Sequence, residues 1–201
     1  MVGIRKIKKL RVGDYTYHLA DVLNEIKSPL FFKIAGKKIK VKSIFENWFT
    51  VDHYLFLKDD YAGIDTITIP LVCLASDELN INLNDEASVE CWKKKALEIK
   101  LIDGYPIARY TWACFDELIN RENVLHHEPT PDEIEAGIEL FKKYSDWGTL
   151  FSIARELHIT IEQVRKLPYN EAFLILNYLK DESDFREKYY KIVLNKMKNE
   201  K

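Results

Sequence analysis

The clearest structural pattern in the chain is IARELHITIEQVRKL, which occupies residues 153–167. Its apolar residues are spaced as in a helix-turn-helix, where two helices pack against each other at a steep angle. Ala154 would be the small residue where the helices approach, and Ile159 would fill the turn. Thr160 and Gln163 form a capping box, in which the side chain of each residue accepts a hydrogen bond from the backbone N–H of the other. The stretch therefore predicts that the C-terminal part is helical.

Helix signals continue on both sides of this stretch. Residues 130–133 (TPDE) form a second capping box, with a proline at the first helical position, where its missing N–H costs nothing. Ser145 is expected to cap the next helix, and Asn170 a long final helix. The first half of that helix, residues 172–179, is apolar almost all round and should be deeply packed. These signals predict an all-helical module over residues 130–201.

The first part of the chain is predicted to be a mixed domain over residues 1–125, with a small antiparallel sheet. Residues 30–44 indicate a β-hairpin, because apolar residues and lysines alternate around a turn containing Gly36. Residues 64–72 are rich in β-forming side chains, and residues 80–84 alternate strictly, so both are expected to be strands. Helices are expected at residues 18–26, 85–99 and 108–119, extended segments at 4–12 and 15–17, and a turn at 103–106. The predicted fold class is therefore α+β.

The composition is that of a packed protein, with 47% hydrophobic and 12% aromatic residues among 201. Neither a signal peptide nor an apolar run long enough to span a membrane is evident. The expected location is the cytoplasm, or the virion if the chain derives from a phage. Cys73, Cys91 and Cys114 form no paired motif and are expected to be buried free thiols.

Charge is distributed unevenly along the chain. Residues 1–42 carry 11 lysines and arginines against 3 acidic residues, whereas residues 43–129 carry 7 against 16. The basic segment interleaves its cations with aromatic residues, as single-strand nucleic-acid binders do. Half-buried strands give the same pattern, so both interpretations stay open. The aromatic residues concerned are Tyr15, Tyr17, Phe31 and Phe32.

No pattern predicts catalysis, a metal or a cofactor, and we expect a protein that is not an enzyme. Adjacent histidines, such as His126 and His127, rarely point at one metal ion. Asp59, Asp60 and Asp65 lack the ligand spacing of a calcium-binding hand. His53 lies beside Asp52, without a nucleophile in a recognisable elbow. A pocket that holds His53 with nearby carboxylates would favour an enzyme.

The helix-turn-helix spacing raises the possibility of a nucleic-acid-binding regulator. Its contacts to bases and phosphates would come from Thr160, Gln163, Arg165 and Lys166. Two features speak against this function. His158 stands where such a turn usually has glycine, and residues 130–201 are near neutral, whereas DNA-binding faces are strongly basic.

A second interpretation comes from the order of elements in the same region. A capped helix is followed by a turn with Thr160, Val164 and Pro168, and then by a helix that contains Glu171 and Tyr178. This order resembles helical phage tail assembly chaperones and related minor tail or baseplate proteins, over about residues 132–190. The resemblance implies assembly work between proteins, such as holding a partner segment or occupying one place in a larger complex.

The final helix offers a candidate surface for such a partner. Phe185, Tyr189, Ile192 and Val193 form a narrow apolar stripe on a charged helix, which is a common way to dock one protein on another. Packing of these residues on their own chain is the alternative. We therefore expect a non-catalytic assembly protein of a multi-protein particle such as a phage tail, with other proteins as partners and nucleic acid as the rival ligand.

Overall fold

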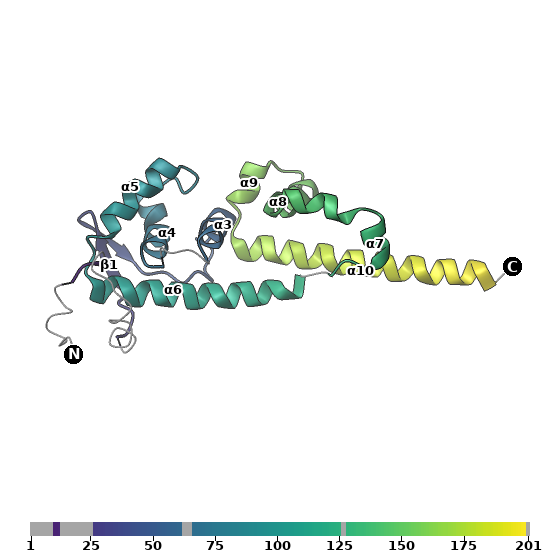
Figure 1. Cartoon of the computed structure of the whole chain (residues 1–201), viewed down its shortest axis with the longest axis horizontal. Helices are drawn as coiled ribbons and strands as arrows, with labels where there is room; N and C mark the ends of the chain where they lie inside the picture. The colour runs from purple at the N-terminus through teal and green to yellow at the C-terminus, as the bar shows by residue number, and fades with distance from the viewer. Residues whose placement is uncertain (1–9, 13–25, 62–65, 126–127, 200–201) are drawn as a thin grey trace. The chain divides into compact units, whose positions relative to one another are not determined.

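The structure is a computed structural model, which describes residues 10–12, 26–61, 66–125 and 128–199 (Figure 1). The described residues are mostly helical. They belong to two compact units, Met1–Ile119 and Asn120–Lys201, which we call the N-terminal unit and the C-terminal unit. The division predicted from the sequence lies between residues 125 and 130. Each unit is described by itself.

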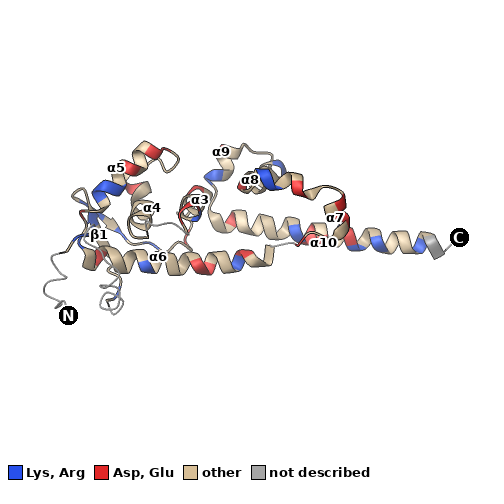
Figure 2. Ribbon diagram, in the orientation of Figure 1, with Lys and Arg blue, Asp and Glu red and all other residues tan. Residues whose placement is uncertain are grey.

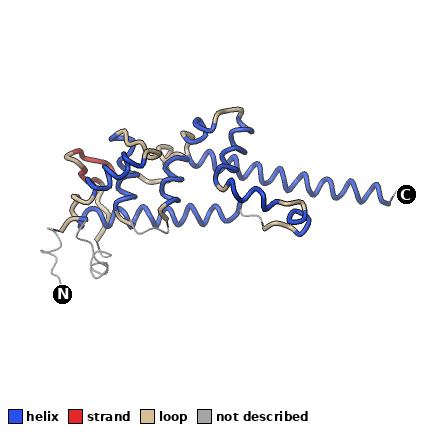
Figure 3. The backbone as a smooth tube through the Cα atoms, turned by 45° about the horizontal axis from the view of Figure 1, so that its top comes forward, coloured by secondary structure: helices blue, strands red, loops and turns tan. Residues whose placement is uncertain are grey.

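The predicted hairpin is confirmed. Strands β1 (Phe31–Ile34) and β2 (Lys37–Lys40) pair antiparallel, with Phe31 opposite Lys40. Ala35 (φ 48°) and Gly36 (φ 81°) make the two-residue turn, whose positive φ angles match the twist of the flanking strands. The hairpin is the only sheet among the described residues, and it is drawn in red in Figure 3.

The strand predicted at residues 64–72 is wrong where the structure describes it. Helix α4 (Thr68–Leu79) begins there, and residues 68–76 are all buried. Pro70 lies in the first turn, where its missing N–H has no intrahelical partner to lose. Because this helix is covered on every side, its apolar run lacks the period that would distinguish a helix from a strand.

The strand predicted at residues 80–84 is also wrong, because its alternating asparagines have separate local roles. Asn80 adopts the left-handed conformation (φ 52°) and ends α4, which asparagine tolerates better than most residues. The Asn82 side chain accepts a hydrogen bond from the backbone N–H of Asn84 (3.1 Å) and forms a turn. Asp85 then caps helix α5 (Glu86–Ala96), which confirms a helix within residues 85–99.

The turn predicted at residues 103–106 does not exist. Helix α6 (Leu101–Glu122) runs through it with Pro106 inside, and it includes the predicted helix at residues 108–119. Gly104 marks a place where the side chain of Val12 packs closely against the α6 backbone, instead of a turn. A Cβ atom at Gly104 would lie 2.7 Å from Cγ2 of Val12, so any side chain would displace this contact.

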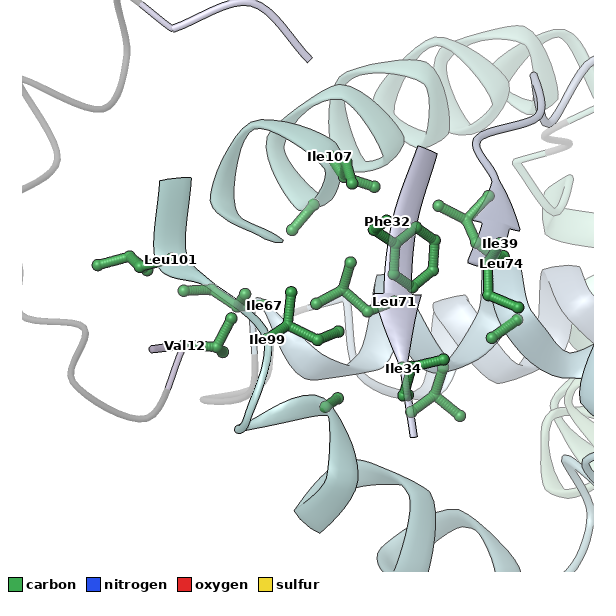
Figure 4. Packing of buried hydrophobic residues seen from close by; sticks show 14 of the residues in the cluster. Val12, Phe32, Ile34, Ile39, Ile67, Leu71, Leu74, Ile99, Leu101 and Ile107 are labelled. Atoms are coloured by element: carbon green, nitrogen blue, oxygen red, sulfur yellow. The ribbon is translucent and has the colours of Figure 1, made fainter. Parts of the chain in front are cut away.

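The N-terminal unit has an extensive hydrophobic core. It is formed by the hairpin, α4, α6 and the segment around Val12, as Figure 4 shows. Arg11 pairs with Lys100 through an isolated antiparallel bridge. Helix α3 (Val51–Asp59) contributes Tyr54 and Leu57 to the buried residues of this unit. The expected elements at residues 15–17 and 18–26 lie outside the described residues, apart from Ile26.

The C-terminal unit contains only helical elements in its described residues, as predicted. They are η3 (Asn123–Leu125), α7 (Pro131–Glu135), η4 (Ile138–Tyr144), α8 (Asp146–Leu157), α9 (Ile161–Arg165) and α10 (Tyr169–Asn199). Both capping boxes are confirmed, because Thr130 and Glu133 exchange hydrogen bonds, as do Thr160 and Gln163. Ser145 precedes α8 but makes no side-chain cap.

The final helix is continuous, but its first half is not packed as predicted. α10 has 31 residues, so it is about 46 Å long. Ala172 is buried, whereas Leu174 is 67% exposed and Tyr178 is also exposed. The helix begins at Tyr169, one residue before the predicted cap at Asn170. The expectation of deep packing fails because the core formed with α8 and α9 covers only one side of this segment.

Candidate protein-binding surface

The C-terminal unit buries few of its apolar residues. Its core lies where α8 and α9 meet the beginning of α10. The buried hydrophobic residues described in this unit are Leu150, Ile153, Val164, Tyr169 and Ala172. Many larger apolar side chains of the same unit are exposed to solvent, and exposed apolar patches of this kind are candidate binding surfaces.

One exposed surface lies on the second half of α10. Phe185, Tyr189 and Ile192 are 66%, 55% and 54% exposed, and Val193 is half-buried. At about 100° per residue, the first three lie within about 60° of one another around the helix axis. The rings of Phe185 and Tyr189 stack with their centroids 6.2 Å apart. We call these four residues the α10 stripe.

Ion pairs along α10 keep its charged side chains close to the helix. Arg186 bonds Glu182 at 2.6 Å, and Lys191 bonds Glu187. The Glu187 carboxylate raises the pKa of Lys191, and the charge of Asp132 in α7 raises it further. Lys191 itself lies about 160° around the helix axis from Tyr189, so this ion pair leaves the Tyr189 side of α10 uncovered.

Residues of η4 and α8 form a second exposed surface. Its aromatic residues are Phe141, Tyr144, Trp147 and Phe151, all exposed, and we call them the aromatic patch. Phe141 lies 6.5 Å from Tyr144, and Trp147 lies 6.2 Å from Phe151, between ring centroids. Aromatic side chains bring a large contact area at a small entropic cost, so they are enriched where proteins bind each other.

Polar contacts fasten the start of the C-terminal unit along α10. The Tyr169 hydroxyl donates to Glu122 Oε1 at 2.6 Å, and the Lys180 ammonium donates to the carbonyl oxygen of Val124. These contacts fix the first half of α10, whereas the stripe lies beyond them. The stripe is therefore presented on a helix that is anchored at its beginning.

The turn between α8 and α9 has the local geometry of a helix-turn-helix, with changes that matter for DNA. His158 takes the left-handed conformation (φ 54°) that glycine usually supplies there. The Thr160 and Gln163 side chains are engaged in the capping box, and Lys166 pairs with Glu162 at 3.0 Å. α9 has five residues, little more than one turn. These features leave little polar surface on α9 for base edges.

The structure brings His53 together with two residues that sequence reasoning missed. His53 is buried, and its Nε2 atom lies 2.8 Å from Ser76 Oγ and 3.4 Å from Asp77 Oδ1. Ser76 and Asp77 come from α4, more than twenty residues later, so no local motif could indicate the group. Asp52 does not take part in it, and instead accepts a hydrogen bond from Asn84.

Ser76 and Asp77 both lie at His53 Nε2, whereas a hydrolytic triad has its nucleophile and its acid on opposite ring nitrogens. The Thr50 backbone N–H donates to His53 Nδ1 (3.2 Å), which in the neutral imidazole leaves the ring proton on Nε2. Ser76 donates its own proton to the Cys73 carbonyl (2.7 Å) and can only accept from His53. The imidazole therefore cannot take a proton from Ser76, as nucleophile activation requires. The hydrogen bond from His53 lowers the pKa of Asp77.

Residues of the basic N-terminal segment line a surface hollow of about 420 Å³, where nucleic acid could be expected to bind. Its charged lining residues are Arg11, Lys33, Lys38, Lys100, Glu98 and Asp103. Phe31 is partly exposed, but the Lys38 ammonium lies 3.9 Å from its ring centroid and covers it. Phe32 is buried in the core, while Tyr15 and Tyr17 lie outside the described residues. The hollow thus offers no open stacking platform among its described aromatic residues.

The remaining sequence expectations concern ligands and thiols. Among the described residues, no three histidine, cysteine or acidic side chains gather where they could hold a metal ion. His126, His127 and Asp65 lie outside the described residues. Cys73 and Cys114 are buried free thiols as predicted, whereas Cys91 is exposed on α5, so its predicted burial is wrong.

No described helix combines the length and the apolar character that crossing a membrane requires. Comparison of the chain with protein-family models, curated proteins and solved structures gives no match.

Proposed function

We propose that this chain is a non-catalytic assembly protein that binds another protein chain through the α10 stripe. One observation carries the proposal: three large apolar residues on one side of α10 are each more than half exposed. Exposed apolar area is costly in water and is stabilised when a partner covers it. An amphipathic helix of this kind docks by its apolar side chains at i, i+4 and i+7 spacing, which Phe185, Tyr189 and Ile192 follow.

The proposed setting is a multi-protein particle of the phage tail or baseplate type. It rests on the resemblance of residues 132–190 to helical tail assembly chaperones and minor tail or baseplate proteins. The small core of the C-terminal unit supports this setting, because an assembly protein completes its apolar packing only with its partners. The aromatic patch provides a second surface on the same unit for a further contact.

A protein partner fits the α10 stripe better than nucleic acid does. Binding to nucleic acid is dominated by lysines and arginines that neutralise phosphates. The α10 stripe is apolar, and two of the cations near it, Arg186 and Lys191, are paired with the carboxylates of Glu182 and Glu187. The candidate DNA contacts at α9 are similarly limited by the Lys166–Glu162 pair.

Site-specific photo-cross-linking tests the proposal. A photoreactive phenylalanine analogue replaces Tyr189 in the full chain, and a matched variant carries it at Asp184, which is exposed on another side of α10. We expect protein cross-links from position 189 and few from position 184, with mass spectrometry identifying the linked chain. Equal, weak labelling at both positions would overturn the proposal.

DNA binding is measured in parallel, by fluorescence anisotropy with duplex and single-stranded DNA at about 50 and 200 mM salt. We expect no DNA binding at either salt concentration. Tight binding that disappears in an Arg165→Ala/Lys166→Ala variant would replace the assembly function with that of a nucleic-acid-binding regulator.

A further inference from the structure

The α10 stripe is part of a longer seam that ends in opposite charges. Glu182, Phe185, Tyr189, Ile192 and Lys196 follow one another at alternating intervals of three and four residues. This is the spacing with which one helix packs along another in a coiled pair. Glu182 and Lys196 therefore lie in line with the apolar residues, each seven positions from Tyr189. The seam is about 21 Å long.

The charge around the seam changes sign at its middle (Figure 2). Residues 181–188 carry four carboxylates with Arg186 and Lys188, whereas residues 190–197 carry two lysines and no carboxylate. The charges of two such seams are complementary only when the two helices run in opposite directions. An antiparallel copy places the acidic half against the basic half, whereas a parallel copy places like charges together.

We propose that the α10 stripe binds a second copy of this chain, with the two helices antiparallel about a two-fold axis near Tyr189. This inference rests on the proposed function, because it names the partner on the same surface. Near the axis, Tyr189 packs beside Tyr189 of the second copy, and Phe185 lies toward Val193 of the second copy. Glu182 comes beside Lys196 of the second copy, and two-fold symmetry forms that ion pair twice.

The surroundings of the seam in the C-terminal unit leave room for this helix. Phe185, Tyr189 and Ile192, the apolar residues at the centre of the seam, are all exposed. The charge of Asp132 in α7 acts on Lys191, which lies about 160° around the helix axis from Tyr189. A helix pair of this kind buries aromatic side chains at its centre and keeps ion pairs at its rim, as stable protein interfaces do.

Charge exchange in the full chain tests the partner. Sedimentation velocity over a wide concentration range compares the wild type with Glu182→Lys, Lys196→Glu and the double variant that carries both changes. We expect the wild type to dimerise. Each single change brings like charges together twice and should weaken the dimer about tenfold or more, while the double variant should recover most of the affinity. Asp184→Lys, with the same change in charge outside the seam, should leave the dimer intact.

Disulfide trapping tests the orientation, in a chain whose exposed Cys91 is replaced by serine. Disulfides require Cα atoms about 4.4–6.8 Å apart. We expect Tyr189→Cys to cross-link two copies at the axis, and the Glu182→Cys/Lys196→Cys double variant to cross-link as well. Glu182→Cys alone should not, because its counterpart lies at the far end of the seam. Efficient cross-linking of Glu182→Cys alone would show a parallel pair and overturn the inference.

The outcomes separate this inference from the proposed function. A chain that stays monomeric while position 189 cross-links to a different protein overturns the inference and supports the assembly function. A monomer without cross-links to any protein overturns both. A dimer unaffected by the charge changes and by Tyr189→Glu forms through another surface, and it also overturns the inference.

Discussion

The two units of this chain treat their apolar residues in opposite ways. The N-terminal unit surrounds α4 with the hairpin, α3, α5 and α6, so that residues 68–76 are all buried. The C-terminal unit buries five hydrophobic residues among those described and leaves most of its aromatic side chains exposed. The first unit has an extensive buried core, whereas the second leaves much apolar surface exposed to solvent. This difference leads to four predictions.

The largest expected effect is a core truncation in the N-terminal unit. Leu71→Ala removes a fully buried side chain from α4 and should lower the free energy of unfolding by about 2–5 kcal/mol, because a cavity remains. Leu174→Ala is the matched change on exposed α10 and should alter stability by less than about 0.5 kcal/mol. Urea unfolding followed by circular dichroism measures both. Equal losses would contradict the contrast between the units.

Two glycine substitutions compare how tightly the two units are packed around a helix. Gly104→Ala forces a methyl group against Val12 in the first unit and should cost about 1–3 kcal/mol. Gly148→Ala in α8 meets no atom within 4 Å and should stabilise its helix by about 0.5–1 kcal/mol. Thermal unfolding of the two variants distinguishes the signs. A stable Gly104→Ala variant would mean that the Val12 side chain moves aside easily.

The capping boxes test how much the C-terminal unit depends on local interactions. Thr160→Ala removes the cap between α8 and α9 and should cost about 1 kcal/mol. Thr130→Ala removes the equivalent cap of α7, a short helix with no buried residue, and should affect the unit less. Urea unfolding followed by circular dichroism measures both losses. A larger loss for Thr130→Ala would mean that α7 supports the unit more than its exposure indicates.

The smallest effect concerns pH and the buried group around His53. The hydrogen bond from His53 lowers the pKa of Asp77 in the folded state below its unfolded value. The resulting stability is present above the unfolded pKa, near pH 3.9, and is lost as the pH falls through the folded pKa. Asp77→Asn should therefore reduce the loss of unfolding free energy between about pH 5 and pH 2.5. Asp184→Asn is the control, and an unchanged pH dependence in Asp77→Asn would contradict the assignment.

Several features were predictable from sequence because they depend on neighbouring residues. The hairpin follows from Ala35-Gly36 between alternating strands, and the starts of α7 and α9 follow from hydrogen bonds between residues three apart. The spacing of Phe185, Tyr189 and Ile192 also predicted the apolar stripe of α10.

Other features depend on contacts with residues that are distant in the sequence. The sequence by itself determined where α5, α7 and α9 begin and where the hairpin turns, because those interactions close within a few residues. Only the tertiary structure decided that residues 68–79 form a helix, since an apolar run buried on all sides is compatible with helix or strand. Only the tertiary structure decided that Leu174 and Tyr178 stay exposed and that His53 meets Ser76 and Asp77. The physical reason is that burial and convergence are set by distant segments, which no local pattern specifies.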